Sequence, residues 1–151
     1  MRDAYGGILN IVFVALFLII VEGILGLVVN YTKAFKMKNN VISVIEQYEA
    51  SGCFQTAGDT ACVGKISAGA KSIGYSPISL NCPSGYDSVK GLFCYKMSNV
   101  DETKNFSGSR PVSYRIVTQV DVNIPIINKI MGFSFFQVSG DTKIIELQTG
   151  R

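Results

Sequence analysis

Histidine is absent from the 151 residues of this chain. Without it the chain lacks the usual general base near neutral pH and the commonest metal ligand, so triad hydrolysis and histidine-ligated zinc are excluded. Charged residues are also scarce, at 17% of the chain, where about a quarter is typical. The formal charge of +3 comes with scattered lysines and no basic patch interleaved with aromatics, so nucleic-acid binding is not expected. We expect no enzyme, with no catalytic residues, no cofactor and no metal site.

The low content of charged residues comes mainly from one segment near the N-terminus. After Arg2 and Asp3 the next charged residue is Glu22, and the next after that is Lys33. The apolar residues 8–29 span ~33 Å as a helix, which is enough to cross a hydrocarbon core of ~30 Å. A cleaved signal has a shorter apolar region and a small-x-small cleavage site, which this chain lacks. We therefore predict an uncleaved transmembrane anchor rather than a buried core helix, which ~120 further residues could hardly surround.

The helical pattern continues beyond the apolar span. Apolar residues recur there at spacings of three, four and seven, and no proline intervenes before Gly52. They are Tyr31, Ala34, Phe35, Val41, Ile42, Ile45 and Tyr48. We predict one helix over about residues 5–51, ~70 Å long. Three parts follow: residues 1–30 as a transmembrane or filament-core helix, residues 31–52 as its amphipathic extension, and residues 53–151 as an extracytoplasmic domain that covers the apolar stripe.

The remaining residues predict one short helix followed by strands. Asp59 or Thr60 can cap a helix that ends at Gly74. Alternation of apolar and polar residues over 112–124 is typical of a half-buried antiparallel strand, and residues 92–97 predict a shorter one. Residues 133–147 predict a last strand, interrupted at 140–141 by a bulge or turn. The expected fold class is α+β, with the long helix packed on a small antiparallel β-sheet.

Four cysteines lie in the C-terminal part: Cys53, Cys62, Cys82 and Cys94. An even number in a small domain, with no C-x-x-C pair, favours disulfides over zinc or redox chemistry. Of the three possible pairings, 53–62 and 82–94 close the shortest loops, and each of these loops contains turn-forming residues. Disulfides predict a domain outside the cytoplasm. The alternative is four reduced thiols in a cytoplasmic domain, which the lysines at 33, 36 and 38 favour through the positive-inside rule.

Glu22 is the most informative residue of the span. A charged side chain in the middle of a membrane helix costs roughly 2.5–3.5 kcal/mol on insertion scales, so it is expected to face protein. It belongs to a stripe of small and polar residues that admits close approach of another helix. This small-residue stripe consists of Ala15, Glu22, Gly23, Gly26 and Asn30. With one span in the chain, the expected partner is another copy, whose Arg2, Lys33 or amino terminus could pair with Glu22. The alternative is a protonated side chain that is hydrogen-bonded to backbone.

Two segments carry a resemblance to a known family. Residues 6–31, GGILNIVFVALFLIIVEGILGLVVNY, combine an apolar span with an internal glutamate. Residues 117–147, VTQVDVNIPIINKIMGFSFFQVSGDTKIIEL, contain a strand, an Ile-Pro turn and a closing strand with a late glutamate, Glu146. A long apolar helix followed by a small β-rich domain resembles the type IV pilins and pseudopilins, and most of all the TadE-like proteins of tight-adherence pilus systems.

The resemblance implies a pilin-like fold and a structural subunit of an extracellular filament. Its partners would be membrane lipid before assembly, further copies of itself in a helical filament, and other pilus-assembly components. The chain departs from the spacing of prepilin peptidase substrates, because Phe17 rather than glycine stands five residues before Glu22. A second interpretation is a single-pass envelope or pilus-assembly protein that stays in the membrane.

Overall fold

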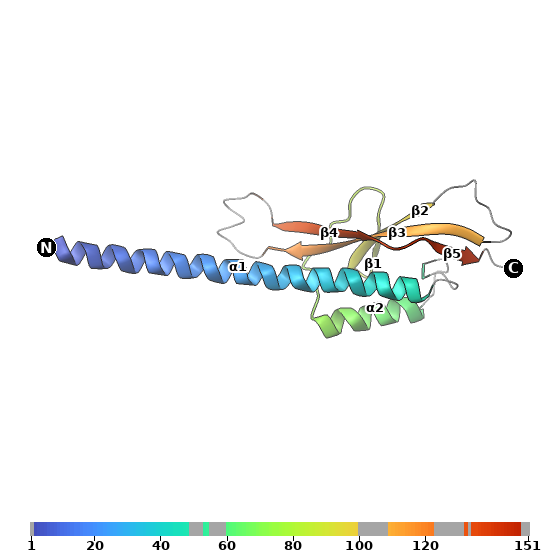
Figure 1. Ribbon diagram of the computed structural model, residues 1–151, viewed down its shortest axis with the longest axis horizontal. Coiled ribbons are helices and arrows are strands. Elements are labelled where there is room, and N and C mark those ends of the chain that lie inside the picture. Colours follow the sequence, from blue (N-terminus) through green and yellow to red (C-terminus); the bar gives the residue numbers. More distant parts are fainter. Residues whose placement is uncertain are drawn as a thin grey trace.

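The structure is a computed structural model that describes residues 2–48, 53–54, 60–99, 109–122, 132 and 134–148. These residues form two helices and five strands. In chain order they are α1 (Arg2–Gln47), α2 (Thr60–Ile73), β1 (Asp87–Val89), β2 (Phe93–Asn99), β3 (Ser109–Asp121), β4 (Phe135–Asp141) and β5 (Ile145–Gln148). The N-terminal half of α1 projects alone, while its C-terminal half lies along the sheet (Figure 1). The predicted α+β fold, with a long helix packed on a small antiparallel sheet, is confirmed.

The outer half of α1 packs on the sheet and on α2 at the same time. Its buried positions are Ala34, Met37, Val41, Val44 and Ile45. Two residues of the predicted apolar stripe differ, because Tyr31 and Phe35 are 44% and 41% exposed. The prediction assumed that the C-terminal domain covers α1 on one side only. Since α2 covers a second side of the helix, the buried face is wider than that stripe and is rotated away from these two aromatic residues.

Helix α2 runs antiparallel to α1 and ends where the sequence predicts. Gly74 has a φ of 67°, a left-handed conformation that glycine adopts without strain. Its N–H donates to the carbonyl of Lys71 at 3.1 Å, and the next N–H, that of Tyr75, donates to Ala70 at 2.9 Å. These two bonds form a Schellman motif, which satisfies carbonyls at the end of the helix.

The sheet is antiparallel and centred on β3. Its order is β1-β2-β3-β4, and β5 pairs with the start of β3. The even-numbered residues of β3 form its buried face toward α1, which confirms the predicted alternation. They are Val112, Tyr114, Ile116, Thr118, Val120 and, just beyond the strand, Val122. The hydroxyl of Thr118 donates to the carbonyl of Ala34 at 3.1 Å and so joins the sheet to α1.

The predicted break in the last strand is wrong by two residues. Strand β4 runs through Gly140 and Asp141, and the irregular segment is 142–144. Thr142 keeps this segment on β3: its N–H donates to the Tyr114 carbonyl and its Oγ1 accepts from the Tyr114 N–H, both at 2.9 Å. Gly140 serves close packing instead of a turn, because a Cβ there would lie 2.9 Å from Cδ of Lys38 on α1.

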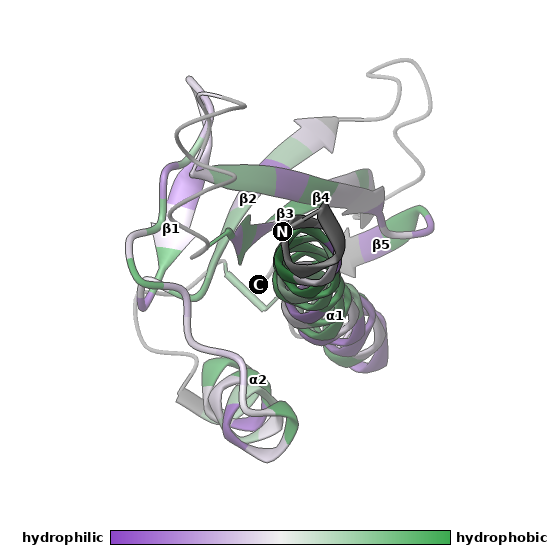
Figure 2. Ribbon diagram, turned by 90° about the vertical axis from the view of Figure 1, so that its left-hand side faces the viewer, coloured by the Kyte–Doolittle hydropathy of each residue, from purple (hydrophilic) through white to green (hydrophobic). Residues whose placement is uncertain are grey.

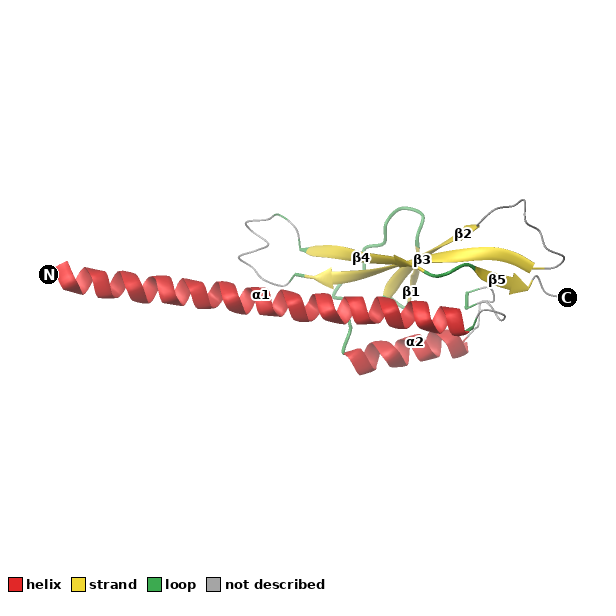
Figure 3. Cartoon of the chain, in the orientation of Figure 1, coloured by secondary structure: helices red, strands yellow, loops and turns green. Residues whose placement is uncertain are grey.

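Two disulfides staple the domain, Cys53–Cys62 and Cys82–Cys94, with Cα atoms 5.7 and 5.6 Å apart. They are the two pairs expected from the sequence. The first joins the segment after α1 to α2, and the second joins the loop after α2 to β2. That loop, residues 75–86, runs from the end of α2 past the edge of the sheet (Figure 3).

Candidate functional site

The N-terminal half of α1 is a surface that the other described helix and strands leave uncovered. In the described part of the chain, α1 is the one helix long and apolar enough to cross a membrane. Most of its large apolar side chains between residues 8 and 29 are 50–70% exposed. Figure 2 looks along α1 from its N-terminus and shows the green apolar turns of this half, which extend beyond the sheet and α2 in Figure 1. So large an apolar surface needs lipid or other protein around it.

Three residues of the predicted small-residue stripe lie on this free surface. Ala15, Glu22 and Gly26 are exposed, and a Cβ added at Gly26 would meet nothing within 4 Å. Gly23, beside them, is half-buried. No described residue forms a hydrogen bond or ion pair with Glu22. The stripe is therefore open to another molecule, and its role as an interface stays a prediction.

Asn30, the fifth residue of the predicted stripe, has a partner within the chain. Its side-chain Nδ2 donates to the carbonyl oxygen of Asp121 at 3.1 Å. Asp121 is the last residue of β3, so this bond joins the end of the apolar span to the end of the central strand. Helical spacing alone placed Asn30 with Glu22 and Gly26, because spacing does not reveal which strand ends beside it.

The two residues proposed as charge partners of Glu22 lie away from it. Lys33 is half-buried and its Nζ is 3.8 Å from where a Cβ on Gly74 would stand. The ammonium is thus near the C-terminus of α2, whose dipole favours a positive charge. Lys33 is ~16 Å from Glu22 along the axis of α1, too far for a pair within one chain. The side chain of Arg2 lies outside the described residues.

Tyr75 forms hydrogen bonds with the edge of β3 close to the bond between Asn30 and Asp121. Strand β2 pairs with β3 only as far as Val117, which leaves the backbone of Gln119 without a strand partner on that side. The Tyr75 hydroxyl donates to the Gln119 carbonyl and accepts from the Gln119 N–H, each at 2.9 Å. Burial raises the pKa of the Tyr75 hydroxyl to about 12. The sequence analysis did not single out this residue.

Gln119 and Asp121 hold the loop after α2 against the sheet. Gln119 is 2% exposed; its Oε1 accepts from the Asn81 N–H at 3.0 Å and its Nε2 donates to the Ser79 carbonyl. Asp121 Oδ2 accepts from the Ile78 N–H at 2.7 Å. The alternation of β3 had placed Gln119 and Asp121 on a polar outer face. The sequence feature that could have indicated this contact is the predicted 82–94 disulfide, since it ties the loop to the neighbouring strand.

Two clefts flank this loop. One of about 220 Å³ lies between the loop, α1 and β3, with Asn30, Lys33 and Tyr75 among its lining residues. The other, of about 190 Å³, lies between Ile78 and Phe135. Among the described residues no group of three or more acidic, cysteine or histidine side chains is placed to hold a metal ion. Both clefts have a mixed polar and apolar lining.

Compared with models of protein families, with curated proteins and with solved structures, the chain has no match. Its function is therefore inferred from its own residues and their arrangement.

Proposed function

We propose that this chain is a structural subunit of a pilus-like extracellular filament, as the resemblance to TadE-like proteins implies. It assembles through the N-terminal half of α1. The observation that carries the proposal is the uncovered helix itself, whose residues 8–29 extend ~33 Å as an apolar rod with 50–70% of most large side chains exposed. Helices of further copies can cover such a rod on all sides.

Glu22 favours assembly over a lipid anchor. A simple anchor needs only apolar residues, and a carboxylate in its middle costs roughly 2.5–3.5 kcal/mol. Packing against another helix gives this group a protein environment instead. Gly26 lies one turn away on the same side with open space around it, so the backbone of a neighbouring helix can approach closely there.

The proposed location of the domain is outside the cytoplasm. Its four cysteines form two disulfides, and such bonds persist in oxidising compartments but are rare in the cytosol. Before assembly α1 spans the membrane with the domain on the outer side. The partners proposed are membrane lipid, other pilus-assembly components and, in the filament, further copies of this chain.

Electron microscopy of material sheared from the cell surface tests the proposal. We expect filaments that an antibody against the domain labels along their length. The alternative function, a single-pass envelope or assembly protein that stays in the membrane, predicts that the chain remains in the membrane fraction and is missing from sheared filaments.

A matched pair of variants tests the small-residue stripe. Gly26→Asp puts a second carboxylate on the stripe, while Ile24→Asp puts one at nearly the same depth on the opposite side, since two residues turn a helix by ~200°. An unpaired charge in a packed interface costs several kcal/mol. We therefore expect Gly26→Asp to abolish filaments and Ile24→Asp to retain more of them, with equal amounts of both chains in the membrane.

The outcome that contradicts the stripe is normal filament formation by Gly26→Asp. Circular dichroism of both purified variants provides the folding control, because both residues are exposed and lie outside the described core.

A further inference from the structure

We propose that the loop of residues 76–81 is a membrane-contacting surface, on which the domain sits against the phospholipid bilayer that α1 spans. Ile78 enters the lipid interface and Lys33 lies beside it at the level of the phosphates. The proposal rests on α1 spanning a membrane. It goes beyond the proposed function by naming a second lipid contact and by fixing the orientation of the domain.

Two hydrogen bonds set the height of this loop. The apolar span ends at residue 29, and the next side chain, Asn30, donates to the Asp121 carbonyl at 3.1 Å. The carboxylate of Asp121 accepts from the Ile78 N–H at 2.7 Å. Ile78 is thus linked through one residue to the end of the span, where the hydrocarbon gives way to headgroups.

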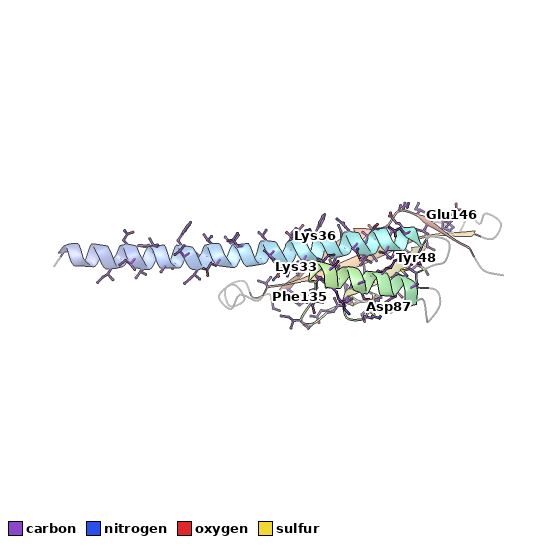
Figure 4. The ribbon with its side chains drawn as sticks, turned by 90° about the horizontal axis from the view of Figure 1, so that it is seen from below. Lys33, Lys36, Tyr48, Asp87, Phe135 and Glu146 are labelled. Carbon is purple, nitrogen blue, oxygen red and sulfur yellow. A yellow bond between two sulfur atoms is a disulfide. The ribbon has the colours of Figure 1, made fainter. Side chains whose placement is uncertain are left out.

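Figure 4 shows which end of the domain lies nearest the membrane-spanning half of α1. Phe135, which lines a cleft with Ile78, lies at about the same level along the molecule as Lys33, at the end of the domain nearest the projecting helix. Tyr48 and Glu146 lie toward the opposite end. The loop therefore belongs to the end of the domain that meets the bilayer when α1 spans it.

No described element of the chain covers the side chain of Ile78. Its side chain is 76% exposed, more than any large apolar residue of the membrane-spanning half of α1. The loop holds it there, since Gln119 binds the backbone of Ser79 and Asn81 on the following residues. No charged residue occurs between Lys71 and Asp87, so the loop can enter the interface without burying a side-chain charge.

The charges around the loop also suit a phospholipid surface. Lys33 is half-buried beside the loop and lines the same cleft as Ile78. A lysine four residues beyond the end of a span can extend its ammonium to the lipid phosphates. The nearby carboxylate of Asp121 already accepts hydrogen bonds from Ile78 and Gln119, which limits its repulsion of those phosphates.

The test uses tryptophan, which the natural chain lacks, as a single fluorescent probe in the full chain. Ile78→Trp reports on the loop. Ile144→Trp is the matched control, because Ile144 is also an exposed isoleucine, at 57%. Its neighbour Lys143 donates its backbone N–H to Glu46 on α1, and Glu46 is ~24 Å farther along the helix than Asn30. Phe17→Trp marks the span itself.

Each variant is reconstituted into phosphatidylcholine vesicles with and without bromine on the upper acyl chain, which quenches nearby tryptophan. We expect Trp emission from position 78 to be blue-shifted and quenched by roughly half, as for a side chain 5–10 Å into the interface. The probe at 144 should be unaffected and the probe at 17 quenched.

Equal, weak quenching at 78 and 144 together with strong quenching at 17 would overturn the loop contact and leave the spanning helix intact. Absence of quenching at 17 would reject the span, and with it both this proposal and the proposed membrane stage of assembly. All three positions are exposed, so the substitutions leave the core unchanged.

Discussion

At the scale of single residues, Tyr75 takes the place of a missing strand. Its hydroxyl satisfies both backbone groups of Gln119 where β2 no longer covers β3. An unpaired buried backbone group costs roughly 1–3 kcal/mol. Removal of this hydroxyl would therefore leave both the N–H and the carbonyl of Gln119 without a partner.

The pKa of Tyr75 predicts a loss of stability at alkaline pH. Its folded-state pKa of about 12 lies above its ordinary value of 10.0, so the folded chain favours the protonated hydroxyl. This stabilisation is fully present below pH 10 and is lost as the pH rises toward 12. Tyr75→Phe should lower the free energy of unfolding by about 1–3 kcal/mol at pH 8 and lose less stability than the natural chain between pH 10 and 12.

Urea unfolding in detergent micelles at pH 8 and pH 11 measures this. Tyr31→Phe is the control, since Tyr31 is 44% exposed and its hydroxyl replaces no strand; a change below about 0.5 kcal/mol is expected. An identical pH dependence in the natural chain and in Tyr75→Phe would contradict the assignment.

At the scale of elements, the contact between α1 and α2 depends on one glycine. Two glycines lie inside α2, where each costs roughly 1 kcal/mol of helix stability relative to alanine. A Cβ at Gly69 would lie 2.8 Å from Cγ of Asn40 on α1, whereas a Cβ at Gly64 would meet nothing within 4 Å. Gly69 is thus required for close helix packing, and Gly64 is not.

These two positions give a pair of opposite predictions. Gly64→Ala should raise the free energy of unfolding by about 0.5–1 kcal/mol through helix propensity. Gly69→Ala should lower it by about 1–3 kcal/mol, because the Asn40 side chain must change its rotamer or α2 must move away from it. Thermal unfolding followed by circular dichroism distinguishes them, and stabilisation by both substitutions would show that the helices are not in close contact at Gly69.

At the scale of the whole molecule, the chain divides into a packed domain and a free rod on the same helix. Among the described residues, the buried core begins at Ala34 and includes none of residues 8–29. The first described side-chain bond from α1 to the sheet comes from Asn30. The apolar excess of the sequence therefore belongs to a surface and adds nothing to the core.

Removal of residues 1–28 is accordingly expected to leave a folded, soluble domain. The shortened chain keeps Asn30, both disulfides and the whole core, so its melting temperature should fall by no more than about 3 °C. Differential scanning calorimetry, with the full chain in detergent as the reference, measures this. Failure of the shortened chain to fold would show that the span supports the domain.

Signals local in the chain determined a large part of this fold. The apolar segment of residues 8–29, in which Glu22 is the single charged residue, predicted a helix long and apolar enough to cross a membrane. The alternation over β3 predicted its buried face, and Gly74 predicted the end of α2. The short spacings between cysteines indicated both disulfide pairs. Each signal is carried by neighbours in the sequence, because helix and strand periods, caps and small loops depend on residues only a few positions apart.

Tertiary structure alone decided the rest. It joined the side chain of Asn30 to the end of β3, buried Gln119 beneath the loop of residues 75–86, and placed the Tyr75 hydroxyl against the edge of β3 that β2 leaves unpaired. It also turned the buried face of α1 toward Met37 and Val44. These outcomes depend on which elements meet, and hydrogen bonds between residues 38 to 91 positions apart leave no periodic trace in the sequence.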